Sequence, residues 1–276
     1  MHEITTSRTE GGANGLGPAI HFAAGDAASA DLYTRSPLSV GHFLSIRWRD
    51  GERPAAAAVL EAVLRAAPRG SEIHLRVDAE VHPRIEERLD VARAHGFALW
   101  QEKEGFAWTD PGGTLPTPEH TVVRRRAEVG RDAYGTAMAS AALDSLDVVQ
   151  ADAVRAMGAR AWANSFMDAY GGPPYDVTWL AAEDTGGDLV GFVAVGRYDE
   201  RGTATIFHIG VGAAYRGHGY IDDLMRIAAR EARERGFRAM VSDVDVRNVP
   251  MMEAMRRHGH RPDLTARHIW YLRRST

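Results

Sequence analysis

The stretch VGAAYRGHGYIDDLM (Val211–Met225) contains two glycines between an apolar strand and an amphipathic helix. A strand that turns into a helix exposes several backbone N–H groups at the helix N-terminus, where the helix dipole attracts an anion. Gly217 and Gly219 let a phosphate approach the backbone without a Cβ in the way, and Arg216 adds a charged donor. A tight turn without a ligand is the alternative that this stretch alone leaves open.

The order of elements over residues 121–276 predicts an α/β fold with a mixed sheet. Short alternating or β-branched segments predict strands, and apolar residues at helical spacing predict helices. The predicted strands are 121–127, 176–184, 188–199, 202–211, 237–246 and 267–274. The predicted helical segments are 131–167, 220–236 and 249–259.

The segment PGGTLPTPEH (111–120) contains three prolines and two glycines, a composition that favours an extended linker. It predicts two domains, at residues 1–115 and 121–276. A long surface loop within one domain would have the same composition, so that alternative stays open.

The first part contains a fainter copy of the last three elements of the second part. Residues 72–80 are strand-like and 82–96 helical, and FALWQEKEGFAWTD (97–110) predicts two strands joined by a charged turn that exposes Lys103. The predicted strand SVGHFLSIRW (39–48) is not followed by paired glycines. We therefore predict a duplicated fold whose first copy lacks the anion-binding turn.

Composition excludes several classes of protein. A formal net charge of −4 gives no footprint for nucleic acid, and the absence of an 18-residue apolar run predicts no membrane span. With no cysteine, thiolate chemistry is excluded and a cytoplasmic protein is expected. Lys103 is the only lysine, so a Walker loop or a Schiff base is not predicted either. His258 and His260 do not have the spacing of a metal pair, and we predict no metal site.

The segments RGHGYI (216–221) and DVRNVPMMEAMRRHG (245–259) resemble the GNAT N-acetyltransferase superfamily. Its signature R/Q-x-x-G-x-G/A is matched in five of six positions over 216–221. The resemblance covers essentially all of 121–276. It implies that acetyl-CoA is a co-substrate, with its pyrophosphate on the loop amides and its pantetheine along HIGV (208–211). The residues that the resemblance places at acetyl-CoA are Ile209, Gly210, Val211, Arg216, Gly217, His218, Gly219, Tyr220, Ile221, Asn248 and Met251.

Three positions depart from the superfamily pattern. Many members carry a tyrosine seven residues after the asparagine, which protonates the leaving thiolate, but this chain has Met255 there. Tyr215, Tyr220 or water would have to replace it. Ile221 occupies the last signature position, where it would add bulk beside the phosphate site without removing a backbone donor. His260 replaces the hydrophobic residue that usually follows the helix-ending glycine.

Paired carboxylates are the first candidates for the acceptor side. Asp243 and Asp245 alternate in SDVDV and are expected to share one face of a strand. Carboxylates there would suit an ammonium acceptor, and Asp245, nearer Asn248, is a candidate catalytic residue. An ion pair with Arg247 or another arginine is the alternative.

His208 is the second candidate base, because histidine accepts a proton near neutrality, although a lone histidine on a strand more often has a structural role. Strand parity places it with Ile206, away from the position of the superfamily's usual base, unless a bulge shifts the register. Tyr170 and Tyr175 are candidates to line the acceptor pocket, and loop packing would explain them as well.

Together these features predict an N-acetyltransferase that moves an acetyl group from acetyl-CoA to a small-molecule amine by direct attack, with one working site in 121–276. One alternative is an acyltransferase of the same fold whose donor is an acylated carrier protein, and another is a non-catalytic acyl-CoA-binding module. The expected partners are a small amine and no nucleic acid or membrane. The sequence leaves monomer and homodimer open.

Overall fold

The structure is a computed structural model that describes residues 3–9, 18–33, 42–78, 84–173, 175–199, 202–263 and 268–275. It divides into two compact units. The first unit consists of Met1–Lys103 and Thr265–Thr276, and the second of Glu104–Leu264. No helix of the described residues is both long and apolar enough to cross a membrane.

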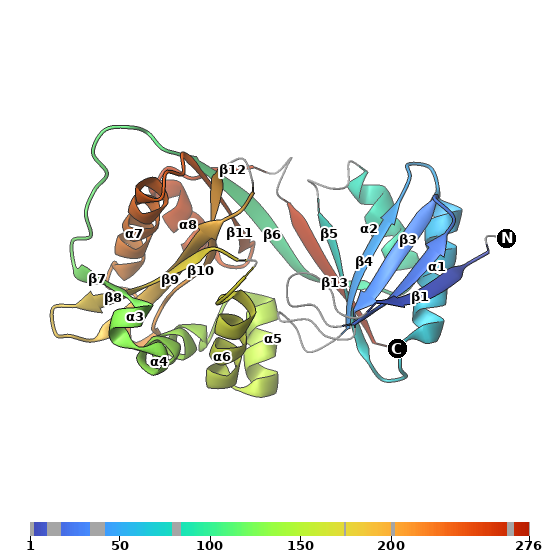
Figure 1. Ribbon diagram of the computed structural model, residues 1–276, viewed down its shortest axis with the longest axis horizontal. Coiled ribbons are helices and arrows are strands. Elements are labelled where there is room, and N and C mark those ends of the chain that lie inside the picture. The colour runs from blue at the N-terminus through green and yellow to red at the C-terminus, as the bar shows by residue number, and fades with distance from the viewer. Residues whose placement is uncertain are drawn as a thin grey trace. The chain divides into compact units, whose positions relative to one another are not determined.

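The first unit is a mixed sheet with two helices (Figure 1). Its strand order is β1-β2-β3-β4-β5-β13-β6, and all described neighbours are antiparallel except β4 and β5, which are parallel. The strands are β1 (Thr5–Thr9), β2 (Ala19–Ala24), β3 (Ala28–Tyr33), β4 (His42–Trp48), β5 (Glu72–Asp78), β6 (Ala98–Thr109, of which the part to Lys103 lies in this unit) and β13 (Ile269–Ser275). The helices are α1 (Arg53–Ala66) and α2 (Ile85–Ala94).

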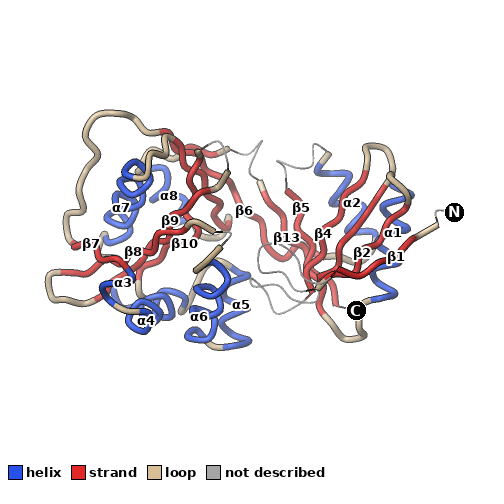
Figure 2. Tube along the Cα trace, in the orientation of Figure 1, coloured by secondary structure: helices blue, strands red, loops and turns tan. Residues whose placement is uncertain are grey.

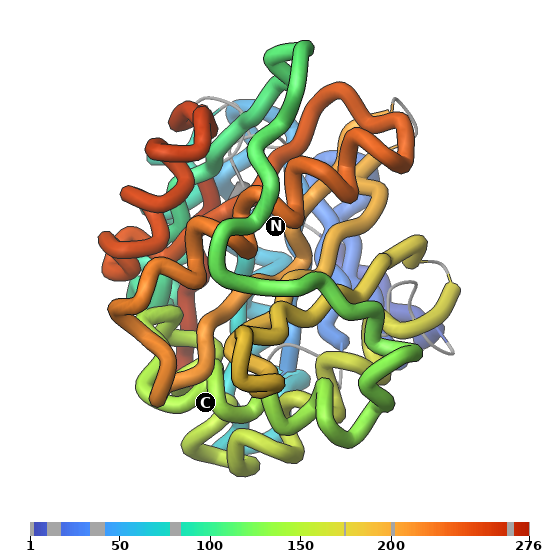
Figure 3. Tube along the Cα trace, turned by 90° about the vertical axis from the view of Figure 1, so that its left-hand side faces the viewer, coloured from blue at the N-terminus to red at the C-terminus, as the bar shows by residue number. Residues whose placement is uncertain are grey.

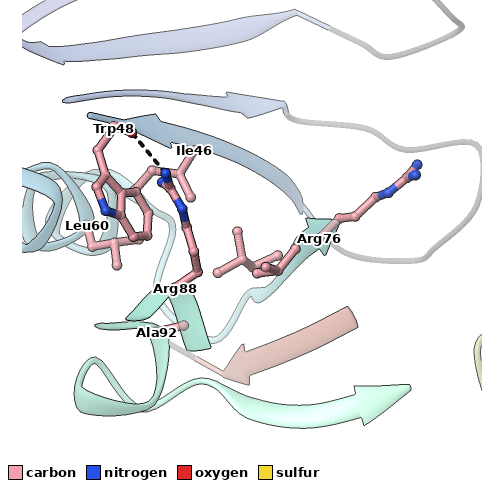
Figure 4. A pocket seen from close by; sticks show the side chains of 8 residues that line it. Ile46, Trp48, Leu60, Arg76, Arg88 and Ala92 are labelled. Carbon is pink, nitrogen blue, oxygen red and sulfur yellow. Dashed lines mark hydrogen bonds between the residues drawn. The ribbon is translucent and has the colours of Figure 1, made fainter. Parts of the chain in front are cut away.

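The parallel strands of the first unit separate after three residue pairs, the last of which is Leu44 with Leu75. Beyond that point the side chains of Trp48 and Arg88 fill the cleft (Figure 4). The Arg88 guanidinium lies 3.8 Å from the centre of the Trp48 ring and donates to the Trp48 carbonyl at 2.9 Å. No space for a water molecule remains between the described side chains there.

The second unit is a mixed sheet between two helical layers (Figures 1 and 2). Its strand order is β6-β11-β10-β9-β8-β7, with the short β12 also paired to β6. The strands are β7 (Thr121–Arg125), β8 (Val177–Asp184), β9 (Leu189–Arg197), β10 (Thr203–Val211), β11 (Ala239–Asp245) and β12 (Arg261–Pro262). The helices are α3 (Arg126–Val129), α4 (Arg131–Ala142), α5 (Val148–Met157), α6 (Ala159–Tyr170), the 3-10 turn η1 (Ala213–Tyr215), α7 (Tyr220–Glu234) and α8 (Val249–Arg257).

Both faces of this second sheet are buried. Leu180, Val193 and Ile206 face a core that contains the apolar side chains of α7 and α8. Trp179 and Phe192 face a second core, made with α4, α5 and α6. β9 is therefore apolar at nearly every position, as a strand covered on both sides must be.

Residues 98–109 form one strand, so the predicted charged turn at Lys103 is wrong. The two glutamates beside Lys103 are accommodated because each has a basic side chain as its partner. Glu102 accepts from His268 at 2.6 Å, and Glu104 pairs with Arg256 at 3.3 Å. Lys103 lies opposite Ile269 of β13 in the ladder.

The segment 110–120 has no regular secondary structure, as predicted, but it is fixed to the second unit along α7 (Figure 3). Asp110 pairs with Arg233 and Arg238, which lower the pKa of its carboxyl to about 2. At the other end, the fully buried carboxylate of Asp223 accepts from the backbone N–H groups of Glu119 and His120. The compact units thus differ from the predicted boundary at 115–121, and residues 265–276 group with the first unit.

Candidate active site

The two parallel strands of the second unit separate next to the glycine turn. β10 and β11 pair through Thr203–Ala239, Ala204–Met240 and Thr205–Val241, where their described ladder ends. From Ile209 to Val211, β10 continues to pair with β9 on its other side. The backbone groups of this stretch that point away from β9 therefore have no strand partner among the described residues, and they can bind an extended ligand.

The glycine turn combines a required backbone conformation with open space. Gly217 and Gly219 have φ values of +85° and +81°, which L-residues rarely adopt. A Cβ added at either glycine would meet no described atom within 4 Å. Gly219 is the N-cap of α7 and offers no side-chain acceptor to the first N–H groups of this helix. The positive φ values therefore explain why glycine is favoured at both positions. The open space also leaves the helix N–H donors accessible to an anion.

The negative charges in the first turn of α7 are already paired. Asp222 accepts from Arg257 and His258, both at 2.9 Å. Asp223 accepts from Arg226 at 3.0 Å in addition to the linker backbone. These contacts reduce the repulsion that two carboxylates would exert on an anion at the same helix end.

Arg216 has a structural partner that the sequence did not indicate. Its guanidinium donates to the carbonyls of Ala141 and Leu143 at 3.0 and 2.6 Å, at the C-terminal end of α4. It thereby joins the glycine turn to the helix layer. Ile221 is partly buried and packs against the core formed with α7 and α8. The pKa of Tyr215 is raised, first by a hydrogen bond to Asp188, which makes it a weaker acid.

A bulge in β10 changes the face on which His208 lies. Ile206 pairs with Val195 of β9, but the next pair is His208 with Ala194, so Phe207 is the extra residue. Strand parity without a bulge predicts that His208 shares a face with Ile206; with the bulge, the two lie on opposite faces. Ile206 belongs to the α7 core, whereas His208 contacts rings of the α4–α6 side.

His208 lies among aromatic rings. The ring centres of Trp162, Phe166 and Phe192 are 5.1 to 5.3 Å from the centre of the imidazole. Tyr170 and Tyr175 belong to the same cluster through Phe207 and Phe166, with Tyr170 and Tyr175 4.8 Å apart. The structure therefore brings three of the predicted site residues to one side of β10.

Gln150 is a neighbour of His208 that sequence analysis missed. Its side-chain nitrogen lies 3.1 Å from Nε2 of His208, and its oxygen accepts from the Ser145 hydroxyl at 2.7 Å. The signal was faint, because Gln150 lies in an amphipathic helix and no spacing rule connects it with a strand 58 residues away.

Asp243 and Asp245 have different environments although they lie on one strand. Asp243 is exposed, and Asp245 is buried with 2% of its surface accessible. The Asp245 carboxylate accepts from the backbone N–H groups of Val148 and Arg247, at 3.0 and 2.9 Å. The hydrogen bond from Arg247 is donated by its backbone N–H. Asp245 connects the end of β11 with the first turn of α5.

The last helix presents polar caps and a buried end. Asn248 caps α8 by accepting from the Met251 N–H at 3.3 Å. Met255 lies in the core with 1% of its surface exposed, so it offers no proton donor. His260 is also buried, against Trp108, where it replaces the hydrophobic residue that the superfamily pattern has.

A separate hollow of about 510 Å³ opens at the edge of β8. β7 pairs with β8 only as far as Arg125 and Leu180, and the hollow lies beyond this point. It is lined by Arg125, Arg126, Ala127, Gly130, Arg131, Val177, Thr178 and Trp179. An arginine-rich wall does not favour an ammonium group, so this hollow is not a candidate acceptor pocket. The described residues contain no group of three or more histidine, aspartate or glutamate side chains that could hold a metal ion.

Residues 134–260, all within the second unit, match the family model described as "Acetyltransferase (GNAT) family". No curated protein sequence matches the chain.

Solved structures match nearly the whole chain at low identity. A GCN5-related N-acetyltransferase from Sphaerobacter thermophilus is 18% identical, with 93% of this chain and 80% of that chain covered and a TM-score of 0.59. A tandem GNAT protein from the clavulanic acid biosynthesis pathway is 14% identical, with coverages of 93% and 82% and a TM-score of 0.61. A GCN5-related N-acetyltransferase from Kribbella flavida is 14% identical, with coverages of 91% and 88% and a TM-score of 0.61. At these identities the likeness shows a shared fold.

Proposed function

Residues 134–260 form a domain of the acetyltransferase (GNAT) family, and on this premise we propose that the protein moves an acetyl group from acetyl-CoA to a small-molecule amine. The predicted α/β fold with two GNAT-like domains in tandem is confirmed by the family match and by the tandem neighbour. The acetyl donor, the amine acceptor and the single working site belong to the proposal.

The observation that carries the proposal is the glycine turn at the N-terminus of α7. Gly217 and Gly219 leave open space where a Cβ would otherwise stand, and the helix N–H groups behind them lack a side-chain cap. This arrangement suits a pyrophosphate. The separation of β10 from β11 leaves backbone donors and acceptors for the pantetheine amides next to it.

The chemistry that we propose needs no covalent enzyme intermediate. The neutral amine nitrogen attacks the thioester carbonyl, the C–N bond forms and the C–S bond breaks. Backbone N–H groups of Ile209 to Val211 polarise the carbonyl. The amine proton passes to His208, or through water, because both carboxylate oxygens of Asp245 already accept backbone N–H groups. Tyr220 or water protonates the thiolate, since Met255 is buried and the Tyr215 hydroxyl is bonded to Asp188.

The proposal is tested by titrating the full chain with acetyl-CoA and with acetyl-pantetheine, followed by turnover with a panel of amines. Free thiol is a clean readout, because the protein contains no cysteine of its own. We expect saturable acetyl-CoA binding with one site per chain, weaker binding of acetyl-pantetheine, and thiol release that depends on the amine. Mass spectrometry of the amine shows whether an acetyl group has been added to nitrogen.

Two other results would replace the proposal. Tight acetyl-CoA binding without turnover on any acceptor indicates a binding module. Failure to bind acetyl-CoA, together with reaction with an acylated carrier protein, indicates a carrier-dependent acyltransferase. One observation favours this second candidate: the Arg216 guanidinium is already hydrogen-bonded to the carbonyls of Ala141 and Leu143. A carrier donor has no adenosine end, so it would need fewer cationic contacts at this position.

A further inference from the structure

The hydrogen bonds that lead to His208 all run in one direction, from Asp147 through Ser145 and Gln150 to the imidazole. The backbone N–H of Asp147 donates to the Ser145 hydroxyl at 3.2 Å, and this hydroxyl donates to Oε1 of Gln150 at 2.7 Å. The Gln150 side-chain nitrogen then lies 3.1 Å from Nε2 of His208. The Gln150 backbone is itself fixed, because its N–H donates to the Asp147 carboxylate at the start of α5.

This direction determines the state of the imidazole. The Ser145 hydroxyl donates its proton to a hydrogen bond with Oε1 of Gln150, so the NH₂ group of the Gln150 amide faces the ring. An N–H donor that faces a ring nitrogen requires a lone pair there, and Nε2 therefore carries no proton. We propose that Gln150 is a positioning residue that holds His208 as the neutral tautomer protonated on Nδ1.

The consequence concerns protonation. A proton on Nε2 would place two donors face to face, so the imidazolium can form only if the Gln150 amide turns and gives up its bond with Ser145. Gln150 thereby keeps the imidazole neutral to a lower pH. A neutral ring leaves a cationic amine unrepelled and can accept a proton at Nε2 once the amide moves aside. This kinetic consequence rests on the proposed function, but the tautomer does not.

Charged groups on the neighbouring elements also affect whether the His208 imidazole is neutral or protonated. The rings in contact with His208 do not titrate, and carboxylates on adjacent elements favour the imidazolium. The described ionisable groups on the elements packed against β10 near His208 are Asp147 at the N-cap of α5, Asp152 and Arg155 of α5, Arg160, Asp168 and Tyr170 of α6, Arg131, Asp132 and Tyr134 of α4, Arg197 of β9, and Asp243 and Asp245 of β11. Four of these groups pair with one another, Arg160 with Asp132 and Arg131 with Asp168. Arg155 pairs with Asp152.

The test is nuclear magnetic resonance of the full chain with ¹⁵N-labelled histidine, with the His208 signal assigned by its loss in His208→Gln. In the wild type we expect Nδ1 protonated and Nε2 unprotonated at neutral pH. In Gln150→Glu, a carboxylate accepts from the ring, so the proton moves to Nε2 and the titration midpoint rises by roughly one to two pH units. In Gln150→Met the donor is lost without a new charge, and the midpoint rises by less than about one unit.

Two controls separate this role from helix stability or general charge. Ala151→Glu adds the same charge one residue along α5, where the side chain points elsewhere, and should move the midpoint far less than Gln150→Glu. Ser145→Ala releases the amide and should give a mixture of tautomers. A wild-type ring protonated on Nε2, or equal midpoints in the wild type, Gln150→Met and Gln150→Glu, would overturn the inference.

Turnover adds an independent readout. If the protein acetylates an amine, the acid limb of the kcat/KM profile should move with the titration midpoint in Gln150→Glu. If the tautomer and the midpoints behave as expected but no amine is acetylated, the proposed function fails and the assignment of Gln150 stands.

Discussion

The two units contain the same strand–helix–strand–helix arrangement, and they differ in what covers the sheet. In each unit, two parallel strands pair over three residues and then separate: β4 from β5, and β10 from β11. In the first unit, β3 and β4 alternate between buried and accessible positions. β9 of the second unit is buried almost throughout, because α4, α5 and α6 cover the face opposite α7. The added layer is what places residues around His208.

The clefts differ as well. In the first unit, Trp48 and Arg88 fill the space between the separated strands (Figure 4). The loop that follows β4 is short and carries Asp50 and Glu52, and Pro54 removes an N–H from the first turn of α1. In the second unit, the loop from Gly212 to Gly219 is longer and carries no carboxylate. A pair of diverging strands therefore makes a binding cleft only when its side chains and its loop leave room for a ligand.

The largest effect is expected for Trp48→Ala. Trp48 is 9% exposed and stacks on the Arg88 guanidinium, whose pKa burial lowers. Truncation of a buried tryptophan should lower the free energy of unfolding by about 3–5 kcal/mol. The acetyl-CoA dissociation constant should stay within about twofold, because side chains fill the first cleft and the proposed site lies in the second unit. Denaturant unfolding and calorimetric titration at low temperature check both. A rise from one to two acetyl-CoA sites per chain would show that the tryptophan only plugs an intact second site.

This comparison also shows what could be predicted from the sequence. The continuous apolar run of β9 and the helical spacing of α7 are local patterns, and both were predicted correctly. Lys103 was wrongly placed in a turn, because the ion pairs that keep β6 extended involve His268 and Arg256, which are distant in sequence. The bulge at Phe207 depends on the register with β9, which the composition of one strand does not reveal.

The predicted site residues also divide into those that a local motif identifies and those whose role depends on partners distant in sequence. Gly217 and Gly219 were identified because a glycine turn is a local signal, although their role at acetyl-CoA stays a prediction. The partners of Arg216 and Asp245 are backbone groups of the α4–α6 layer, at Ala141 and Val148, and no motif encodes such contacts. Gln150 was missed because its meaning comes only from the ring that it faces.

The second-largest effect concerns the loss of stability in acid, which should come from a buried histidine of the second unit and not from its counterpart in the first. Each contains a histidine with 2% of its surface exposed, His74 and His260. His74 has a carboxylate partner in Glu72, whereas burial lowers the pKa of His260 from 6.5 to about 4. Below pH 6.5 the unfolded chain binds a proton at His260 that the folded chain does not bind, so stability falls as the pH falls from 6.5 to 4. The full loss is about 3 kcal/mol, at 1.36 kcal/mol per pH unit.

His260→Leu should flatten this part of the stability profile, and His74→Leu should not. Urea unfolding at pH 7.0, 6.0, 5.0 and 4.0 gives the comparison. If the wild type and His260→Leu lose stability in parallel over this range, His260 is not the source of the acid sensitivity.

Two glycines with the same backbone conformation test whether only the loop of the second unit binds acetyl-CoA. Gly51 and Gly219 have φ values of +85° and +81°, and a Cβ at either would meet no described atom within 4 Å. Valine should therefore cost a similar 1–2 kcal/mol of backbone strain at both positions. Only Gly219→Val should weaken acetyl-CoA, by about 100-fold, because the side chain blocks charge-assisted backbone contacts. Arg216→Ala should weaken it less, since the backbone donors remain. Equal dissociation constants for Gly51→Val and Gly219→Val would remove the turn from the site.

The smallest effect is expected for Asp245→Asn, which tests the helix layer that distinguishes the second unit. Both Asp245 oxygens accept backbone N–H groups, one of them from Val148 of α5. An asparagine replaces one acceptor by a donor, so one N–H loses its partner at a cost of about 1–2 kcal/mol of stability. If this contact also positions α5 over β10, and with it Gln150 against His208, kcat/KM for the amine should fall severalfold while the acetyl-CoA dissociation constant stays nearly constant. Melting temperature, both KM values and kcat are measured on the same variant, at a temperature where it remains folded. A lower melting temperature with unchanged amine kinetics would confine Asp245 to stability, and the contrast between the units would then rest on His208 and the glycine turn alone.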